Sequence, residues 1–212
     1  MPVPLHLAST SPARLATLRA VGIEPIAIAP GVDEEAAVEE AAVAAARPLA
    51  AAEMVQLLAR LKAEAVIGHP AVRDGIVVGG DSAFELDGVV FGKPHRPEVA
   101  RERWRAQRGR TGLLHSGHHV IRVVDGVTVA AAGVPAVASV TFASDITDAE
   151  IEAYLATGEP LEVAGAFTID SKGAPFIERV EGDPHAVVGL SIPLLRTLVR
   201  SLGVEWTELW NR

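Results

Sequence analysis

Two Asp-Gly dipeptides in the middle of the chain, Asp87-Gly88 and Asp125-Gly126, constrain the fold more than any other feature of the sequence. Asp-Gly favours the tight two-residue turns that join neighbouring antiparallel strands. The residues around both dipeptides fit this structure, because 84–91 reads as one short hairpin and 113–123 and 127–142 are extended segments. The sequence therefore predicts two central hairpins.

Helix-capping and helix-breaking residues predict several helices before, between and after these hairpins. Short apolar runs predict further strands. Ser11-Pro12 reads as the cap and first position of a helix, and Thr147 to Glu150 fits a capping box. We expect an α/β protein whose mixed sheet is flanked by helices on both faces, with a smaller lobe from the central hairpins, as a single domain over residues 1–212. The predicted helices are 12–20, 48–67, 97–108, 147–157 and 193–202; the other strands are 3–8, 26–29, 76–78 and 175–180; and the loops are 30–35, 165–173 and 181–184.

Composition restricts both the core and the functional classes. Hydrophobic residues make up 49% of the 212 residues and aromatic residues only 4%, which predicts a core packed by Ala, Val, Leu and Ile. The net charge of −8 argues against a long nucleic acid or an anionic membrane as a partner. The chain has no cysteine, which excludes disulfides, thiol catalysis and cysteine metal sites. Without a long apolar run or a signal-like start, we expect a soluble cytoplasmic protein.

Basic residues indicate where an anion could bind. Arg14 would lie in the first turn of the first helix, where the helix dipole disfavours a cation. Together with the Ser11 hydroxyl and the free amides of that turn it could hold a phosphate, or it could be a solvated surface residue. Only three of the 19 basic residues are lysines, Lys62, Lys93 and Lys172, so these positions could require a compact ammonium.

Two groups of carboxylates are candidates for metal or proton chemistry. Asp81 follows a buried-type strand at Gly79-Gly80, a place where ligands gather in open α/β sheets. It could ligate Mg²⁺ or accept a proton from water, or it could only cap a turn. Asp33, Glu34 and Glu35 are either a second part of this site or a solvated acidic loop.

Other motifs argue against alternative chemistries. The glycines before Lys93 have the wrong spacing for a Walker A loop, and Pro94 stands where that loop needs Ser or Thr. His115, His118 and His119 alternate between the two faces of a predicted strand, so we expect a partly exposed strand rather than a metal cluster. Ser116 lacks the surroundings of a nucleophile elbow.

Taken together and in order, several fragments resemble the Maf family of nucleoside triphosphate pyrophosphatases. The resemblance extends from the first strand to residue 190, so it covers nearly the whole chain. It implies a fold like that of inosine-triphosphate pyrophosphatases, a homodimer, and hydrolysis of a nucleoside triphosphate to a monophosphate and pyrophosphate with Mg²⁺ or Mn²⁺. The fragments are 7–14, 32–34, 61–63, 79–82, 92–94, 109–111, 116–117, 154–160, 164–167 and 188–190.

The resemblance assigns expected roles to individual residues. It implies that Asp81 is the proton acceptor and that Glu34, with Asp81, belongs to the metal site. The residues expected to bind substrate are Ser11, Arg14, Lys62, Ser82, Lys93 and Asp170. Two of the three lysines thus lie at motif positions, in agreement with the argument from composition.

Three departures from the family pattern bear on specificity. Ala13 replaces an arginine or an aromatic residue, and Ser82 replaces threonine while keeping the hydroxyl. Asp170 stands where a pyrimidine-specific subgroup has Gln and a 7-methyl-GTP subgroup has Glu. An ionised Asp only accepts hydrogen bonds, which suits the donors of guanine. We therefore expect a 7-methyl-GTP-like substrate, with a dTTP/UTP preference as one alternative and a non-catalytic nucleotide-binding regulator of septum formation as another.

Overall fold

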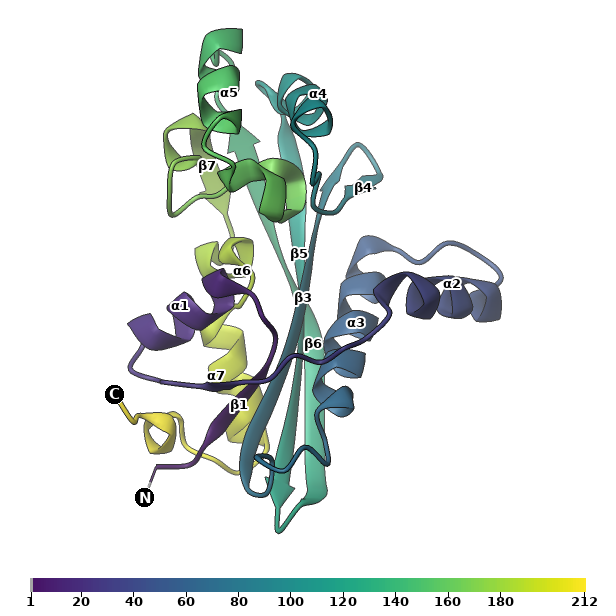
Figure 1. Cartoon of the computed structure of the whole chain (residues 1–212), viewed down its shortest axis with the longest axis vertical. Coiled ribbons are helices and arrows are strands. Elements are labelled where there is room, and N and C mark those ends of the chain that lie inside the picture. Colours follow the sequence, from purple (N-terminus) through teal and green to yellow (C-terminus); the bar gives the residue numbers. More distant parts are fainter. Residues whose placement is uncertain (1) are drawn as a thin grey trace.

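The computed structural model describes residues 2–212 as an α/β structure in which seven helices flank an open mixed sheet of seven strands (Figure 1). The strand order is β2-β1-β3-β5-β6-β7, and β4 pairs with β3. The expected fold class is confirmed. The strands are β1 Leu5–Ala8, β2 Ile26–Ala27, β3 Gly75–Leu86, β4 Val89–Phe91, β5 Thr111–Val124, β6 Val127–Phe142 and β7 Ile177–Glu181. The helices are α1 Pro12–Ala20, α2 Glu34–Ala45, α3 Ala51–Ala65, α4 Pro97–Gln107, α5 Asp148–Leu155, α6 Pro184–Val188 and α7 Ile192–Ser201, with the 3-10 turns η1 Glu159–Glu162, η2 Ala164–Ala166, η3 Ala174–Phe176 and η4 Trp206–Leu209.

Both Asp-Gly turns form as predicted. Asp87 and Gly88 have φ of 51° and 79°, and Asp125 and Gly126 have φ of 52° and 77°. The first turn joins β3 to β4 and the second joins β5 to β6 as antiparallel pairs. Positive φ at both central residues matches the right-handed twist of the flanking strands. The long strands β3, β5 and β6 extend along the long axis of the molecule (Figure 1).

One edge of β3 is paired at both ends and open in the middle. β1 runs parallel to its first half and stops where Ala8 pairs with Gly79, whereas β4, antiparallel to its last residues, ends where Phe91 pairs with Phe84. Within the described part of the chain, residues 80–83 therefore have a strand partner only on the β5 side. The edge of β3 at residues 80–83 is therefore accessible to a ligand.

The core divides along the sheet into an aromatic lobe and an aliphatic body. In the lobe, Trp104 of α4 and Phe142 of β6 pack edge to face with ring centroids 5.5 Å apart, and Phe84 joins them. Aliphatic side chains fill the body on both faces of the sheet. The lobe includes the expected hairpin, but it also takes α4, α5 and β7, because long β5 and β6 carry distant parts of the chain to the same end (Figure 1).

Two expectations about local structure are wrong, and a third is incomplete. Only residues 30–33 of the expected acidic loop are irregular, because Asp33 accepts a hydrogen bond from the Ala36 amide (3.1 Å) and caps α2. The loop predicted at 181–184 is present at residues 182–183, but the helix that follows it, α6, was not predicted; Asp183 caps this helix. The histidine strand is not partly exposed throughout, because α3 and α6 cover β5 and bury His115 and His118.

Candidate active site

A buried lysine joins two carboxylates at the open edge of β3. The Nζ of Lys62, on α3, lies 2.6 Å from Asp81 Oδ1 and 2.7 Å from Glu34 Oε1. Glu34 is the first residue of α2. Lys62 and Asp81 are 7% and 9% exposed, whereas Glu34 remains about half exposed. A compact ammonium can contact both carboxylates at once. This agrees with the argument from composition that the few lysine positions require an ammonium.

Glycines in the sheet bring Lys62 this close to Asp81. A Cβ on Gly79 would collide with the carbonyl oxygen of Ala59, and one on Gly117 would collide with that of Val55. Both collision partners belong to α3, so the helix backbone rests directly on β3 and β5. The first glycine of the Gly79-Gly80 pair therefore allows α3 to pack closely on the sheet.

The environment of Asp81 disfavours its charged form. Burial raises the pKa of Asp81 above its ordinary value, and the nearby Glu34 adds to this effect, although Lys62 and Arg14 oppose it. A carboxylate that is harder to ionise than a surface aspartate is a stronger base once it is ionised. Its second oxygen, Oδ2, accepts no hydrogen bond from the described residues.

Arg14 reaches the same edge from the opposite face of the sheet. Its guanidinium donates to the Gly189 carbonyl oxygen (2.9 Å), the Ser82 hydroxyl (3.0 Å) and the Ser9 hydroxyl (3.3 Å). Arg14 is only 8% exposed, so the alternative of a solvated surface residue is wrong. Burial lowers its pKa, and Asp81 and Glu34 partly offset this. All three direct partners are uncharged, which leaves a buried cation suited to an incoming anion.

A chain of hydroxyl groups fixes the orientation of Arg14. Ser116 donates to the Ala186 carbonyl oxygen (2.7 Å), and its oxygen lies 2.9 Å from the Ser82 hydroxyl. Because the only proton of Ser116 is committed to Ala186, Ser82 donates to Ser116 and accepts from Arg14. The sequence analysis considered Ser116 only as a nucleophile and assigned it no role beside Ser82, because nothing local shows that β5 places it there.

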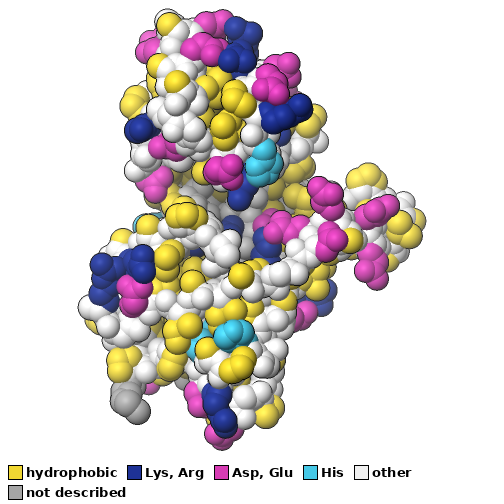
Figure 2. Space-filling view, viewed as in Figure 1, with side chains coloured by type: hydrophobic (Ala, Val, Ile, Leu, Met, Phe, Trp, Pro, Cys, Tyr) yellow, Lys and Arg dark blue, Asp and Glu magenta, His cyan; other side chains and the backbone are white. Residues whose placement is uncertain are grey.

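All of the predicted site residues line one cavity of about 1170 Å³. The cavity lies between the aromatic lobe and α2, where Figure 2 shows basic and acidic side chains side by side in a recess. Its lining includes Lys93, just after β4, and Asp170, in the loop between η2 and η3. The predicted residues brought together are Ser11, Arg14, Glu34, Lys62, Asp81, Ser82, Lys93 and Asp170.

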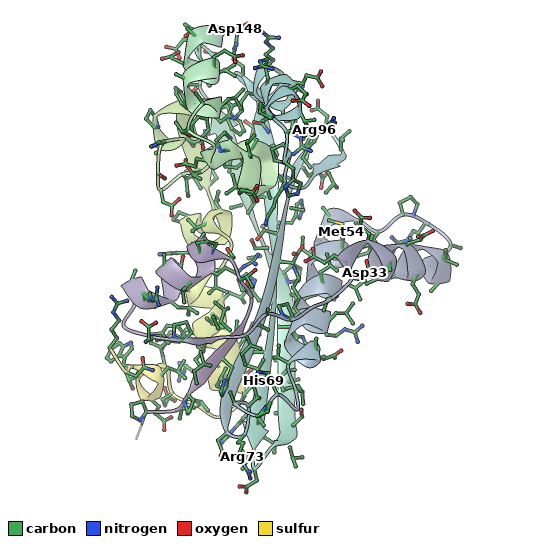
Figure 3. All side chains as sticks on the ribbon, viewed as in Figure 1. Asp33, Met54, His69, Arg73, Arg96 and Asp148 are labelled. Atoms are coloured by element: carbon green, nitrogen blue, oxygen red, sulfur yellow. The ribbon has the colours of Figure 1, made fainter. Side chains whose placement is uncertain are left out.

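One wall of the cavity was not expected from the sequence. Glu35, Val38 and Glu39, on one side of α2, line it together with Met54, which Figure 3 shows near the start of α3 beside α2. No residue of α2 is buried, and the helix projects from the body (Figure 1). The acidic segment therefore contributes a wall of the cavity as well as Glu34.

The donor set fits a divalent cation that also takes oxygen atoms from a substrate. Residues 2–212 contain no cluster of three His, Asp or Glu able to enclose a metal by themselves. Asp81 and Glu34 offer two carboxylates to one side of the cavity. Mg²⁺ is commonly held by one or two carboxylates together with water and phosphate oxygens, so these two residues suffice for it.

Comparisons with known proteins show the family of this chain. The model of the family described as Maf-like protein matches residues 4–202. The chain is 68% identical over 212 residues to a protein of Leifsonia xyli named nucleoside triphosphate pyrophosphatase, covering 98% of this chain and 97% of that one. Proteins with the same name from Cutibacterium acnes and Rhodococcus opacus are 50% and 47% identical, over 97% and 96% of this chain and 93% and 94% of theirs. This chain therefore belongs to the Maf-like protein family.

Proposed function

We propose that this protein hydrolyses a nucleoside triphosphate to a nucleoside monophosphate and pyrophosphate, with Mg²⁺ or Mn²⁺ as cofactor. The observation that carries the proposal is one cavity in which buried cations and a hard-to-ionise carboxylate face each other. Relatives that match nearly the whole chain are named for this activity. None of the helices formed by residues 2–212 is long and apolar enough to cross a membrane.

The proposed reaction is an attack of water on the α-phosphorus. The water oxygen bonds to phosphorus, the bond to the bridging oxygen breaks, and pyrophosphate leaves with that oxygen. Asp81 accepts the proton of the water at its second carboxylate oxygen. A divalent cation, held by Asp81 and Glu34, would supply charge neutralisation on the phosphates.

Three cations share the task of binding the leaving phosphates. Arg14 offers guanidinium N–H groups from one face of the sheet, and Lys62 offers an ammonium from the other. Lys93 adds an ammonium from the exit of β4. Neutralising charge on the transferred and leaving oxygens is the dominant need in phosphoryl transfer.

For the base, we propose a guanine-type substrate such as 7-methyl-GTP, read by Asp170. This residue lines the cavity, and as an acceptor it suits the N1–H and amino groups of guanine. A preference for dTTP and UTP would contradict this part of the proposal. Replacing Asp170 by Gln, which both donates and accepts, is expected to shift preference toward pyrimidines.

Release of pyrophosphate tests the activity directly. The protein is incubated with normal and methylated nucleoside triphosphates, with Mg²⁺ or Mn²⁺ and then with a chelator. Metal-dependent pyrophosphate release supports the proposal. Nucleotide binding without any pyrophosphate release would refute catalysis and leave a nucleotide-binding regulator as the better interpretation.

A further inference from the structure

A single carboxylate outside the reacting groups gathers four hydrogen-bond donors. Oε1 of Glu159 accepts from Thr168 Oγ1 (2.6 Å), Tyr154 Oη (2.8 Å) and the Gly173 amide (3.3 Å). Its other oxygen, Oε2, accepts from Ser171 Oγ (2.7 Å). Three of these donors belong to 168–173, so Glu159 holds this segment at its beginning, middle and end.

The segment held by Glu159 is the one that carries Asp170. It lies between the 3-10 turns η2 and η3 and contains no helix or strand. Thr168, Ile169 and Asp170 line the cavity. Because a segment without backbone ladders depends on side-chain contacts for its shape, the position of Asp170 depends on Glu159.

Glu159 is itself anchored to the aromatic core. It is the first residue of η1 and directly follows Gly158, whose φ of 76° separates η1 from the preceding helix α5. Tyr154, one of its donors, packs edge to face on buried Trp104 with ring centroids 5.4 Å apart. The clamp therefore connects a rigid core to a segment that lacks regular structure.

The end of the segment at Gly173 has no space for a side chain. A Cβ on Gly173 would lie 2.6 Å from the Thr168 carbonyl oxygen and 2.7 Å from the Tyr154 hydroxyl. Thr168 also accepts the Gly173 amide at 3.1 Å through its hydroxyl. The two ends of the segment thus meet at Glu159, and Asp170 lies between them in the sequence.

The donors around Glu159 favour its ionised form. Burial works to raise the pKa of Glu159, but hydrogen bonds from Thr168, Ser171 and Tyr154 outweigh it and lower the pKa. A charged acceptor makes stronger hydrogen bonds than a neutral one. The clamp is consequently fully formed at neutral pH.

From this arrangement we propose that Glu159 is a positioning residue that determines base selectivity by holding Asp170 against the cavity. The inference rests on the proposed function, in which Asp170 reads the base. Glu159 contacts neither the Lys62–Asp81 pair nor Arg14, so loss of the clamp should affect the base end of the substrate and spare the phosphate end.

Two variants of the clamp and one control test the proposal. Glu159→Gln removes the charge and keeps the shape, and Ser171→Ala removes one donor from an exposed position. Glu178→Ala is the control, because Glu178 is exposed on β7 and its side chain makes no hydrogen bond with the described residues. Thermal unfolding verifies that each variant is folded.

The measurements separate the two ends of the substrate. The kcat/KM and the equilibrium binding constant are determined for a panel of nucleoside triphosphates, and the inhibition constant for inorganic tripolyphosphate, which has no base. For Glu159→Gln we expect the ratio of kcat/KM between the two best bases to fall by about tenfold, which corresponds to about 1.4 kcal/mol. For Ser171→Ala the same ratio should fall less. The inhibition constant for tripolyphosphate should stay unchanged in both variants.

Two outcomes would overturn the proposal. The first is an unchanged base ratio in Glu159→Gln together with faster hydrogen exchange of amides 168–173, which would mean that the clamp orders the segment without affecting selectivity. The second is an equal loss of tripolyphosphate inhibition, which would mean a general collapse of the site. If the wild-type protein binds nucleotides selectively but releases no pyrophosphate, the proposed function fails alone, and the binding ratios still decide the role of Glu159.

Discussion

The ammonium of Lys62 is shared between Asp81 and Glu34, at 2.6 Å and 2.7 Å, across the edge of β3 that neither β1 nor β4 covers. The three residues come from α3, β3 and α2. Their proximity joins the buried Lys62–Asp81 pair to the half-exposed carboxylate of Glu34. In the proposed reaction, entry of a triphosphate would bring further negative charge to this cluster, which Arg14 and the proposed divalent cation would offset.

Replacing Asp81 by Asn should abolish proton acceptance and keep the shape of the site. We expect kcat to fall by about 10²- to 10³-fold with saturating metal, the usual effect of losing one group that acts in the transition state. Asp145→Asn, at an exposed position outside the cavity, is the matched control. Steady-state pyrophosphate release decides, and near-wild-type turnover of Asp81→Asn would contradict the assignment.

Replacing Arg14 by Lys keeps the charge but removes the planar fork. An ammonium at this position cannot reach Gly189, Ser82 and Ser9 and still face the cavity. We expect tripolyphosphate binding to weaken by about tenfold, equivalent to one charge-assisted hydrogen bond. Arg19→Lys on the same helix, whose partner is the exposed Glu24, serves as control and should bind as the wild type does.

The glycine that lets α3 rest on the sheet should tolerate no side chain. A Cβ on Gly79 would strike the Ala59 carbonyl, so Gly79→Ala must push α3 away from β3. We expect a loss of about 1–3 kcal/mol in the free energy of unfolding, measured with urea. At Gly92 a Cβ meets open space, and Gly92→Ala should cost much less. Equal stability of both variants would refute the close approach.

His118 should make the protein sensitive to acid. Its Nε2 accepts the Ser191 amide (2.8 Å), and its Nδ1–H donates to the Ser116 carbonyl oxygen (3.0 Å), an arrangement that requires the neutral ring. Burial lowers the pKa of His118 to about 4; Arg14 also lowers it, whereas the Ser116 hydrogen bond and Asp183 raise it.

The sign of the effect follows from proton binding. Below pH about 6.5 the unfolded chain binds a proton at His118 before the folded protein does, so stability falls as pH falls toward about 4. The contribution is at most about 1.4 kcal/mol for each pH unit. Urea unfolding between about pH 7 and about pH 5 should show a steeper loss for the wild type than for His118→Gln. Parallel curves would contradict the prediction.

The sequence by itself determined the features whose chemistry is local. Asp87-Gly88 favours the positive φ of a tight turn, and Ser11 caps α1 through its own hydroxyl, so the hairpins and most helices could be predicted. The residues that the family resemblance predicted to bind substrate all line the same cavity, and their role in binding stays a prediction. Misplaced elements were those where a local signal was ambiguous, as for Asp33, which caps a helix instead of lying in a loop.

Only the tertiary structure decided what depends on residues distant in sequence. Arg14 is buried because Gly189 and Ser82 come to it from 175 and 68 residues away, and no pattern around Arg14 indicates either partner. The pairing of Lys62 with Asp81 requires the contact of α3 with the glycines of β3 and β5. Propensities and caps act over a few residues, whereas burial and charge pairing arise only when the sheet brings separate segments together.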